Sequence, residues 1–224
     1  MAIHRGDREL DVVLREGSTA QVRPATPADA PAVRLLLRGL SDRSRWLRFF
    51  SAFPDLATAA RWATEVDNDR RYGLVATVDG HGQIVGHAGM ERESDRPERA
   101  EVALEIADAM QGKGLGTVLL CQLAEAANEL GIQVMVAEVL PENRQMLGVF
   151  RDCGYPVKVH SLPGVELVEL RTSLPSTGLS LKSRPTRRHE RTSWARGQST
   201  TTLSWPFHRR GGTAGPHRRL ELSK

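Results

Sequence analysis

Several features that define other protein classes are missing from this sequence. The two cysteines, Cys121 and Cys153, form neither a disulfide framework nor a metal-ligand spacing, and their apolar helical surroundings predict reduced thiols. No stretch approaches about eighteen consecutive apolar residues, so no membrane-spanning helix is expected. The first residues, MAIHRGDRELDVVL, contain no apolar core of a signal peptide. We therefore expect a cytoplasmic protein without a metal site.

The charge of the chain is divided unevenly. Of the net charge of +4, residues 175–224 carry +9, from eleven Lys and Arg against two Glu, which leaves −5 for residues 1–174. The segment 175–224 is rich in Ser, Thr, Pro, Gly and Arg and shows no hydrophobic period, so we predict a disordered basic C-terminal tail. Its aromatic residues could stack on a nucleic acid, but a solvated extension is the favoured interpretation.

The rest of the chain alternates between strand and helix patterns. A helix is predicted to begin at Pro27 after the capping residue Thr26, and residues 41–66 form one or two more helices, broken near Phe53. Strands are predicted at 11–14, 20–23, 72–78, 83–90, 100–107, 132–139, 157–160 and 165–170, and further helices at 116–130 and from Pro141 to Gly154. This order predicts an α/β protein (an α+β mixed sheet) with helices on both faces, in a single domain of residues 1–174.

A glycine-rich turn, QGKGLG at residues 111–116, lies between a predicted strand and a predicted helix. Gly112, Gly114 and Gly116 allow the backbone to turn tightly and to bring N–H groups close to a ligand. The helix that follows adds its positive dipole end. The turn lacks the Gly-Lys-Ser/Thr ending of a Walker A loop and does not match the dinucleotide fingerprint GxGxxG. It predicts an anion site suited to a pyrophosphate, with a loop that binds no ligand as the alternative.

This turn resembles the acyl-CoA signature Q-x-x-G-x-G of the GNAT N-acetyltransferase superfamily. A second segment, from Asn143 to Tyr155, matches that family's N-x-x-M-x-x-x-F-x-x-x-G-Y arrangement, and VRPATPADA at 22–30 is similar to its first strand and helix. The resemblance spans roughly residues 10–172. More narrowly, LSDRSRWLRFF at 40–50 and AEVLPENRQML at 137–147 resemble the bacterial Pat-type protein-lysine acetyltransferases.

The resemblance implies a GNAT-like fold in which acetyl-CoA lies between two splayed strands. Backbone groups of Ala103, Leu104 and Glu105 would pair with its pantetheine arm, and Asn143 would contact the arm from the other side. Lys113 would either add a charge near a phosphate or be a solvated turn residue. The residues of the turn would hold the pyrophosphate: Gln111, Gly112, Lys113, Gly114, Leu115 and Gly116.

Acylation of an amine requires a base, because a lysine amine with an ordinary pKa near 10.4 is only about 0.1% neutral at physiological pH. Strand alternation places Glu101 and Glu105 on one face, on either side of Ala103. Glu101 occupies the position of the base in Pat-type enzymes and is our candidate catalytic residue, for which burial would have to raise its pKa. Glu105 is the second candidate, although an exposed strand carboxylate is the favoured interpretation. Many GNAT enzymes carry a tyrosine acid where this sequence has Phe150.

Other residues near the expected acceptor side have a structural and a functional interpretation. Arg43, Arg45 and Arg48 could help to select a substrate, although a solvated face is favoured for each. His87 could line the cleft, although a surface or core histidine is favoured. The aromatic residues of this region are predicted to belong to the core: Trp46, Phe49, Phe50 and Phe53.

Together these patterns predict an acyltransferase that moves an acetyl group from acetyl-CoA to an amine. A protein lysine, such as one on an acyl-CoA synthetase, is the preferred acceptor, and a small amine is the alternative. For the protein as a whole, the alternatives are a non-catalytic acyl-CoA sensor and nucleic-acid binding through the basic tail.

Overall fold

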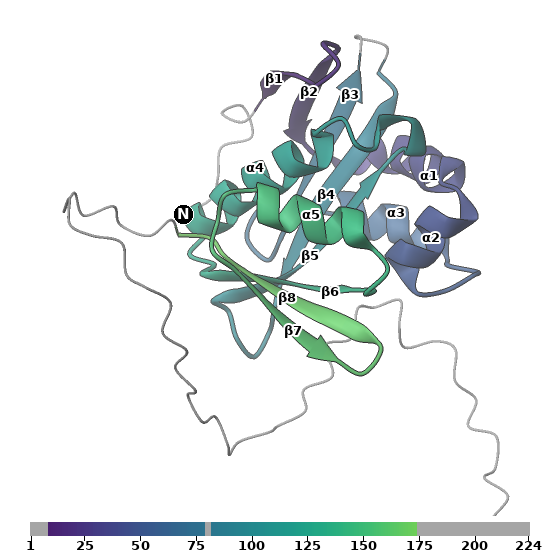
Figure 1. Cartoon of the computed structure of the whole chain (residues 1–224). Coiled ribbons are helices and arrows are strands. Elements are labelled where there is room, and N and C mark those ends of the chain that lie inside the picture. The colour runs from purple at the N-terminus through teal and green to yellow at the C-terminus, as the bar shows by residue number, and fades with distance from the viewer. Residues whose placement is uncertain (1–8, 79–81, 174–224) are drawn as a thin grey trace, which may run out of the picture. The chain divides into compact units, whose positions relative to one another are not determined.

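The computed structural model describes residues 9–78 and 82–173, and these contain eight strands and five α-helices (Figure 1). The strands are β1 (Leu10–Val13), β2 (Thr19–Pro24), β3 (Arg71–Val78), β4 (Ile84–Arg92), β5 (Arg99–Ile106), β6 (Val134–Val139), β7 (Val157–Leu162) and β8 (Val165–Arg171). The helices are α1 (Ala30–Gly39), α2 (Asp42–Phe49), α3 (Leu56–Thr64), α4 (Leu115–Glu129) and α5 (Arg144–Asp152). Two 3-10 helices, η2 (Pro27–Asp29) and η3 (Asp108–Met110), complete the described elements.

All eight strands form one sheet in the order β1-β2-β3-β4-β5-β6-β8-β7. Neighbouring strands are antiparallel except β5 and β6, which are parallel. Parallel neighbours need a crossover connection, and α4 lies in the segment that joins these two strands. The predicted mixed α/β sheet is confirmed.

Helices cover both faces of the sheet, as two consecutive residues of β4 show. A Cβ added to Gly86 would lie 3.0 Å from Leu119 Cδ1 and 3.3 Å from Leu115 Cδ2, both in α4. The next residue, His87, points to the opposite face, where its Nε2 lies 3.2 Å from Ala63 O of α3. Alternation along β4 and β5 therefore sends one set of side chains to α4 and the other set to the opposite face. That face is covered by α1, α2 and α3 (Figure 1).

The predicted start of the last helix at Pro141 is wrong. The helix α5 begins at Arg144, and Asn143 is its N-cap, with Oδ1 accepting a hydrogen bond from Met146 N at 3.2 Å. Asn143 has a non-helical backbone, with φ −82° and ψ 63°. An asparagine that caps the helix defines its start more strongly than a proline that merely tolerates a first helical position.

The predicted aromatic core of the α2 region is wrong for two of its members. Phe49 is 3% exposed, whereas Trp46 is 45% and Phe53 is 95% exposed. The helix α2 ends at Phe49, and its C-cap Phe50 has a left-handed φ of 52°, so the helical spacing does not continue to Phe53. Trp46 lies within α2 and is exposed there.

Some expectations concern single groups or lie outside the described residues. Cys121 and Cys153 are free thiols, and Cys121 Sγ lies 3.2 Å from Cys153 O. In the described ranges, no helix combines the length and the apolar character that a membrane crossing requires. The basic tail predicted for residues 175–224 lies outside the described residues.

Candidate active site

The strands β5 and β6 pair with each other over only part of their length, and the sheet is split beyond that part. Their ladder ends where Glu101 lies opposite Val136. Beyond that point β5 stays paired with β4, and β6 stays paired with β8, so the facing edges of β5 and β6 form the two arms of a V. The three residues predicted to pair with a pantetheine arm lie on the β5 arm: Ala103, Leu104 and Glu105.

At the C-terminal end of β5, η3 leads into the glycine-rich turn. Gly112 and Gly114 have φ values of 76° and 93°, which L side chains rarely adopt. Gly114 is the N-cap of α4, and no side chain caps the N–H groups of the first turn. Gln111 Nε2 donates to Ile106 O at 3.1 Å and to Asp108 Oδ1 at 3.0 Å, which fixes the turn. The turn therefore directs N–H groups and a positive helix end toward the wide end of the V, an arrangement that fits an anionic group.

The last two residues of the predicted turn are packing residues. Leu115 is fully buried on the β4 side of α4. A Cβ on Gly116 would lie 3.4 Å from side-chain atoms of both Leu104 and Val149. Their backbone N–H groups, and not their side chains, are what they can offer to a ligand.

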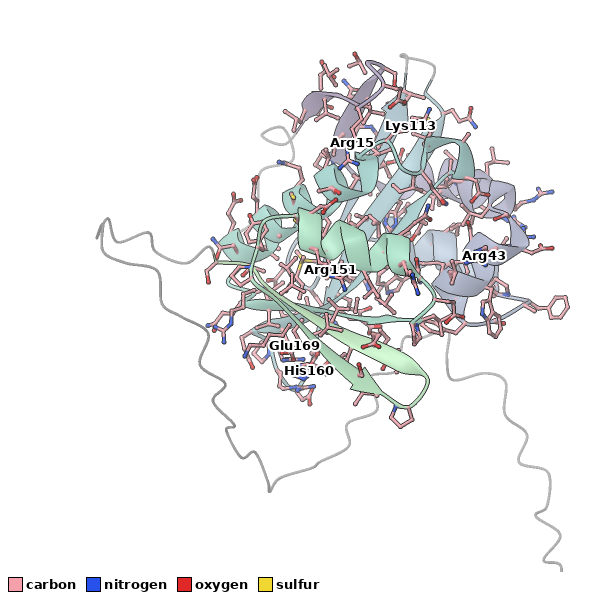
Figure 2. The ribbon with its side chains drawn as sticks, in the orientation of Figure 1. Arg15, Arg43, Lys113, Arg151, His160 and Glu169 are labelled. Atoms are coloured by element: carbon pink, nitrogen blue, oxygen red, sulfur yellow. The ribbon has the colours of Figure 1, made fainter. Side chains whose placement is uncertain are left out.

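The hairpin between β1 and β2 contacts the same turn. Arg15 N donates to Lys113 O at 3.1 Å, and Lys113 Nζ lies 2.9 Å from Glu16 Oε1. The Arg15 guanidinium lies beside Gly114 and 3.7 Å from the Asp152 carboxylate of α5, and Figure 2 shows Arg15 and Lys113 close together near the start of α4. Lys113 is thus an ion-paired turn residue, and Arg15 is a second cation there. About 100 residues separate Arg15 from the turn, so no local pattern indicated this contact.

Glu101 lies on the β5 arm where the V begins, and it is partly buried. Burial, followed by the nearby Glu138 carboxylate of β6, raises the pKa of Glu101 to about 8, while the Arg48 charge opposes the rise. Burial also raises the pKa of Glu138. The burial that a glutamate base requires is therefore present at Glu101, whose carboxylate binds a proton far more strongly than a free glutamate.

Glu105 lies on the same face but is buried and ion-paired, so the expectation of an exposed carboxylate is wrong. Its Oε2 accepts a hydrogen bond from Arg48 Nε at 2.8 Å, and its Oε1 lies 2.9 Å from His87 Nδ1. Burial raises the pKa of Glu105, but Arg48 and His87 outweigh it and lower the pKa to about 2. A carboxylate held at that pKa binds a proton poorly near neutral pH, which favours Glu101 over Glu105 as the candidate base.

The three arginines of α2 differ in their surroundings. Arg43 is exposed and points away from the sheet (Figure 2). Arg45 pairs with Asp42 in the preceding turn of the same helix. Arg48 alone among the three is bonded to the sheet, so the solvated face predicted for all three holds for Arg43 and not for Arg48.

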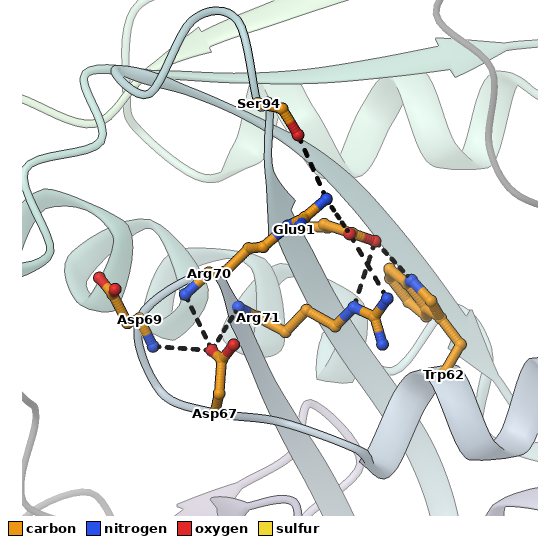
Figure 3. A network of polar contacts seen from close by, with 7 residues as sticks. All are labelled: Trp62, Asp67, Asp69, Arg70, Arg71, Glu91 and Ser94. Carbon is orange, nitrogen blue, oxygen red and sulfur yellow. Dashed lines mark hydrogen bonds and ion pairs between the residues drawn. The ribbon is translucent and has the colours of Figure 1, made fainter.

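Glu91 lies directly opposite the candidate base, on β4, and is held in a polar network (Figure 3). Its Oε2 accepts a hydrogen bond from Trp62 Nε1 at 2.7 Å, and its carboxylate lies 3.2 Å from Arg70 and 3.3 Å from Arg71. The backbone at the start of β3 is fixed by Asp67, whose Oδ1 accepts hydrogen bonds from three backbone N–H groups, including those of Arg70 and Arg71. These partners come from α3, the loop after it and the first residue of β3, and no local sequence pattern predicts them.

Neither tyrosine of the chain occupies the position of a general acid. Tyr72 is 2% exposed, and Tyr155 is partly buried against the core. Phe150, which the resemblance placed at the position of a tyrosine acid, is fully buried. Among the described residues, no group of three or more His, Cys, Asp and Glu side chains could hold a metal ion.

The split sheet and the uncapped glycine-rich turn place the chain in a known class. Residues 21–156 match the family model of the acetyltransferase (GNAT) domain. The chain therefore belongs to the GNAT family, and it is an acyltransferase.

The proteins similar to this chain carry names that refer to different acetyltransferases. The GNAT domain of PAT from S. lividans is 38% identical, with a TM-score of 0.66 over 73% of this chain and 96% of that domain. Acetyltransferase Pat from Mycolicibacterium smegmatis is 30% identical over 164 residues, 72% of this chain, and this chain spans about half (48%) of that relative. The L-methionine sulfoximine/L-methionine sulfone acetyltransferase of Pseudomonas aeruginosa is 27% identical over 145 residues, 62% of this chain and 81% of that protein.

Proposed function

We propose that this acyltransferase moves an acetyl group from acetyl-CoA to the ε-amine of a protein lysine, such as one on an acyl-CoA synthetase, with Glu101 as the base. The observation that carries the proposal is the partly buried Glu101 carboxyl group, with its raised pKa, at the closed end of the V. A protein lysine is the preferred acceptor because the sequence resembles the Pat-type protein-lysine acetyltransferases, and two of the similar proteins are named PAT or Pat.

The residues present fit acetyl-CoA. The backbone of Ala103, Leu104 and Glu105 provides one side of the V for the pantetheine arm, and Asn143 lies four residues after β6, which forms the other side. The segment 111–116 offers backbone N–H groups and the N-terminus of α4 to a pyrophosphate. The Arg15 side chain adds a positive charge at the same place.

The proposed reaction is direct transfer. Acetyl-CoA supplies an activated acetyl group: the lysine nitrogen forms a bond to the carbonyl carbon, the carbon–sulfur bond breaks, and CoA leaves as the thiolate. Glu101 takes up the proton that the amine loses, directly or through a water molecule. Since both tyrosines pack in the core, the thiolate either leaves without a dedicated acid or is protonated by water.

Replacing Glu101 with Gln tests its role as the base. Gln keeps the shape of the side chain and cannot take up the proton, so we expect the acetyl-CoA Kd to stay within about threefold while kcat falls at least about tenfold. Isothermal titration with acetyl-CoA and a thiol-release assay measure the two quantities. Glu142→Gln, at an exposed carboxylate, is the matched control and should change neither. Unchanged turnover of Glu101→Gln would remove Glu101 as the base.

A small amine is the second candidate acceptor, and the Pseudomonas relative is the observation that favours it. Acetyl-CoA turnover should be measured against lysine-containing proteins, including an acyl-CoA synthetase, and against small amines, including L-methionine sulfoximine. Turnover with small amines alone would replace the protein lysine as acceptor. Tight acetyl-CoA binding without turnover on any acceptor would instead identify a sensor.

A further inference from the structure

One buried cation acts on both glutamates of the β5 face. Arg48 Nε donates to Glu105 Oε2 at 2.8 Å, with 14% of the Arg48 side chain and 3% of the Glu105 side chain exposed. The same guanidinium charge acts on Glu101, where it opposes the rise of the pKa. Arg48 therefore influences two carboxylates and is bonded to one of them.

His87 fixes the other oxygen of Glu105. Its Nδ1 lies 2.9 Å from Glu105 Oε1 and its Nε2 lies 3.2 Å from Ala63 O, and the side chain is fully buried. Glu105 is thus held on one oxygen by Arg48 and on the other by His87, and it cannot move away from Arg48 without leaving a buried charge unpaired.

Three more charged groups act on Glu101, and all are carboxylates: Glu138 of β6, Glu91 of β4 and Glu93 of the following loop. Two of them are themselves ion-paired with nearby arginines, Glu91 with Arg70 and Arg71, and Glu93 with Arg96 and Arg99. These arginines are therefore engaged elsewhere. Arg48 is the cation whose position decides whether Glu101 gains a partner.

We propose that Glu105 is a positioning residue whose side chain, anchored by His87, holds Arg48 away from Glu101. Without the Glu105 carboxylate, the guanidinium would be released to pair with Glu101, and a glutamate paired with arginine is a weak base. The inference rests on the proposed function, because it explains why Glu101 is able to act as the base. It assigns the acceptor-side helix α2 an electrostatic role in the reaction.

Carbon-13 NMR of glutamate carboxyl groups tests this directly. The Glu101 signal is identified by its absence in Glu101→Gln and is then titrated in the full chain. In Glu105→Gln, the pKa of Glu101 should fall by at least about one pH unit, as expected for a carboxylate that gains an arginine. In Arg48→Gln it should rise, because the opposing charge is gone. The double variant should follow Arg48→Gln.

A control and a second readout separate positioning from packing. Asp29→Asn removes a different arginine–carboxylate pair, the bidentate one with Arg23, three strands away from β5, and it should leave the Glu101 titration unchanged. The pH profile of kcat/KM should move in the same directions as the titrations. Shifts of equal sign in Glu105→Gln and Arg48→Gln, or no shift in either, would overturn the inference.

If Glu105→Gln does not fold, the pKa of Glu101 is measured in Arg48→Gln alone. An unchanged pKa in that variant contradicts the inference. The titration does not require turnover, so it is distinguishable from the proposed function. Full activity of Glu101→Gln would refute the base while the NMR shifts remained as expected. Absent shifts with an inactive Glu101→Gln would refute the positioning role and leave the base in place.

Discussion

Glu101 and Glu105 differ in protonation although they share a residue type, a strand and a face. Glu105 has Arg48 on one oxygen and His87 on the other, and its pKa is lowered to about 2. Glu101 is surrounded mainly by other carboxylates, and burial together with Glu138 raises its pKa to about 8. The neighbouring elements, not the strand itself, therefore decide which of the two can accept a proton near neutral pH.

Gly114 should be required for CoA binding because of its backbone. At a φ of 93° an alanine is strained by about 1–3 kcal/mol, so the turn of Gly114→Ala would relax and have to be re-formed on binding. We expect the CoA Kd to rise at least about tenfold by isothermal titration. Gly131→Ala is the matched control, since Gly131 has a φ of 78° just beyond the other end of α4 with no atom within 4 Å of the added Cβ. Equal Kd values for both variants would contradict a role for the turn.

The sequence predicted the residues of the site that belong to local motifs, and it missed their partners. Strand alternation placed Glu101 and Glu105 on one face, and the turn was recognised from its glycines. Arg48 lies 57 residues from Glu105 and His87 lies 18 residues from it, so the contacts that separate the two glutamates exist only in the folded chain. The attachment of Arg15 to the turn is likewise a tertiary contact.

At the scale of elements, strands and helices were predictable because each type has its own hydrophobic period. The first or last residues of some helices were not predictable from that period. The two strands of the β3–β4 pair and the helix α4 lie where alternation and helical spacing placed them. The start of α5 was misplaced because Pro141 and Asn143 both suit a helix N-terminus and only the cap hydrogen bond distinguishes them. Phe53 is exposed because α2 ends at Phe49, before a left-handed Phe50.

Asn143 combines a cap with a predicted ligand contact, and two substitutions separate these roles. Asn143→Ala should lower the free energy of unfolding by about 1 kcal/mol in urea titrations, because Met146 N loses its acceptor. Asn143→Ser keeps a capping oxygen and should remain close to wild-type stability. If Asn143 also contacts the pantetheine arm, Asn143→Ser will bind CoA more weakly than the wild type even though its stability is close to that of the wild type. Wild-type affinity in Asn143→Ser would restrict Asn143 to the cap.

At the scale of the whole molecule, the raised pKa of Glu101 makes stability depend on pH. The folded state binds more protons than the unfolded state between an ordinary glutamate pKa of about 4.3 and about 8, so stability from this group falls as pH rises through that window. Glu101→Gln should therefore have the melting temperature of the wild type at pH 4 and a melting temperature about 2–4 °C above that of the wild type at pH 8.5. Scanning calorimetry at both pH values measures this, and Glu142→Gln should show no difference at either. A lower melting temperature of Glu101→Gln at pH 8.5 would contradict the burial of a protonated Glu101.

The V between β5 and β6 divides the sheet into two panels, β1–β5 and β6–β8, whose ladders meet over three residue pairs. A pantetheine arm in the V would act as an edge partner for both panels, in the way an added strand completes a sheet. Its binding energy would then count toward folding, by about 2.7 kcal/mol when the ligand is at 100 times its Kd. The concentration of acetyl-CoA would thus affect the stability of the contact between the two panels, as well as the rate of acetyl transfer.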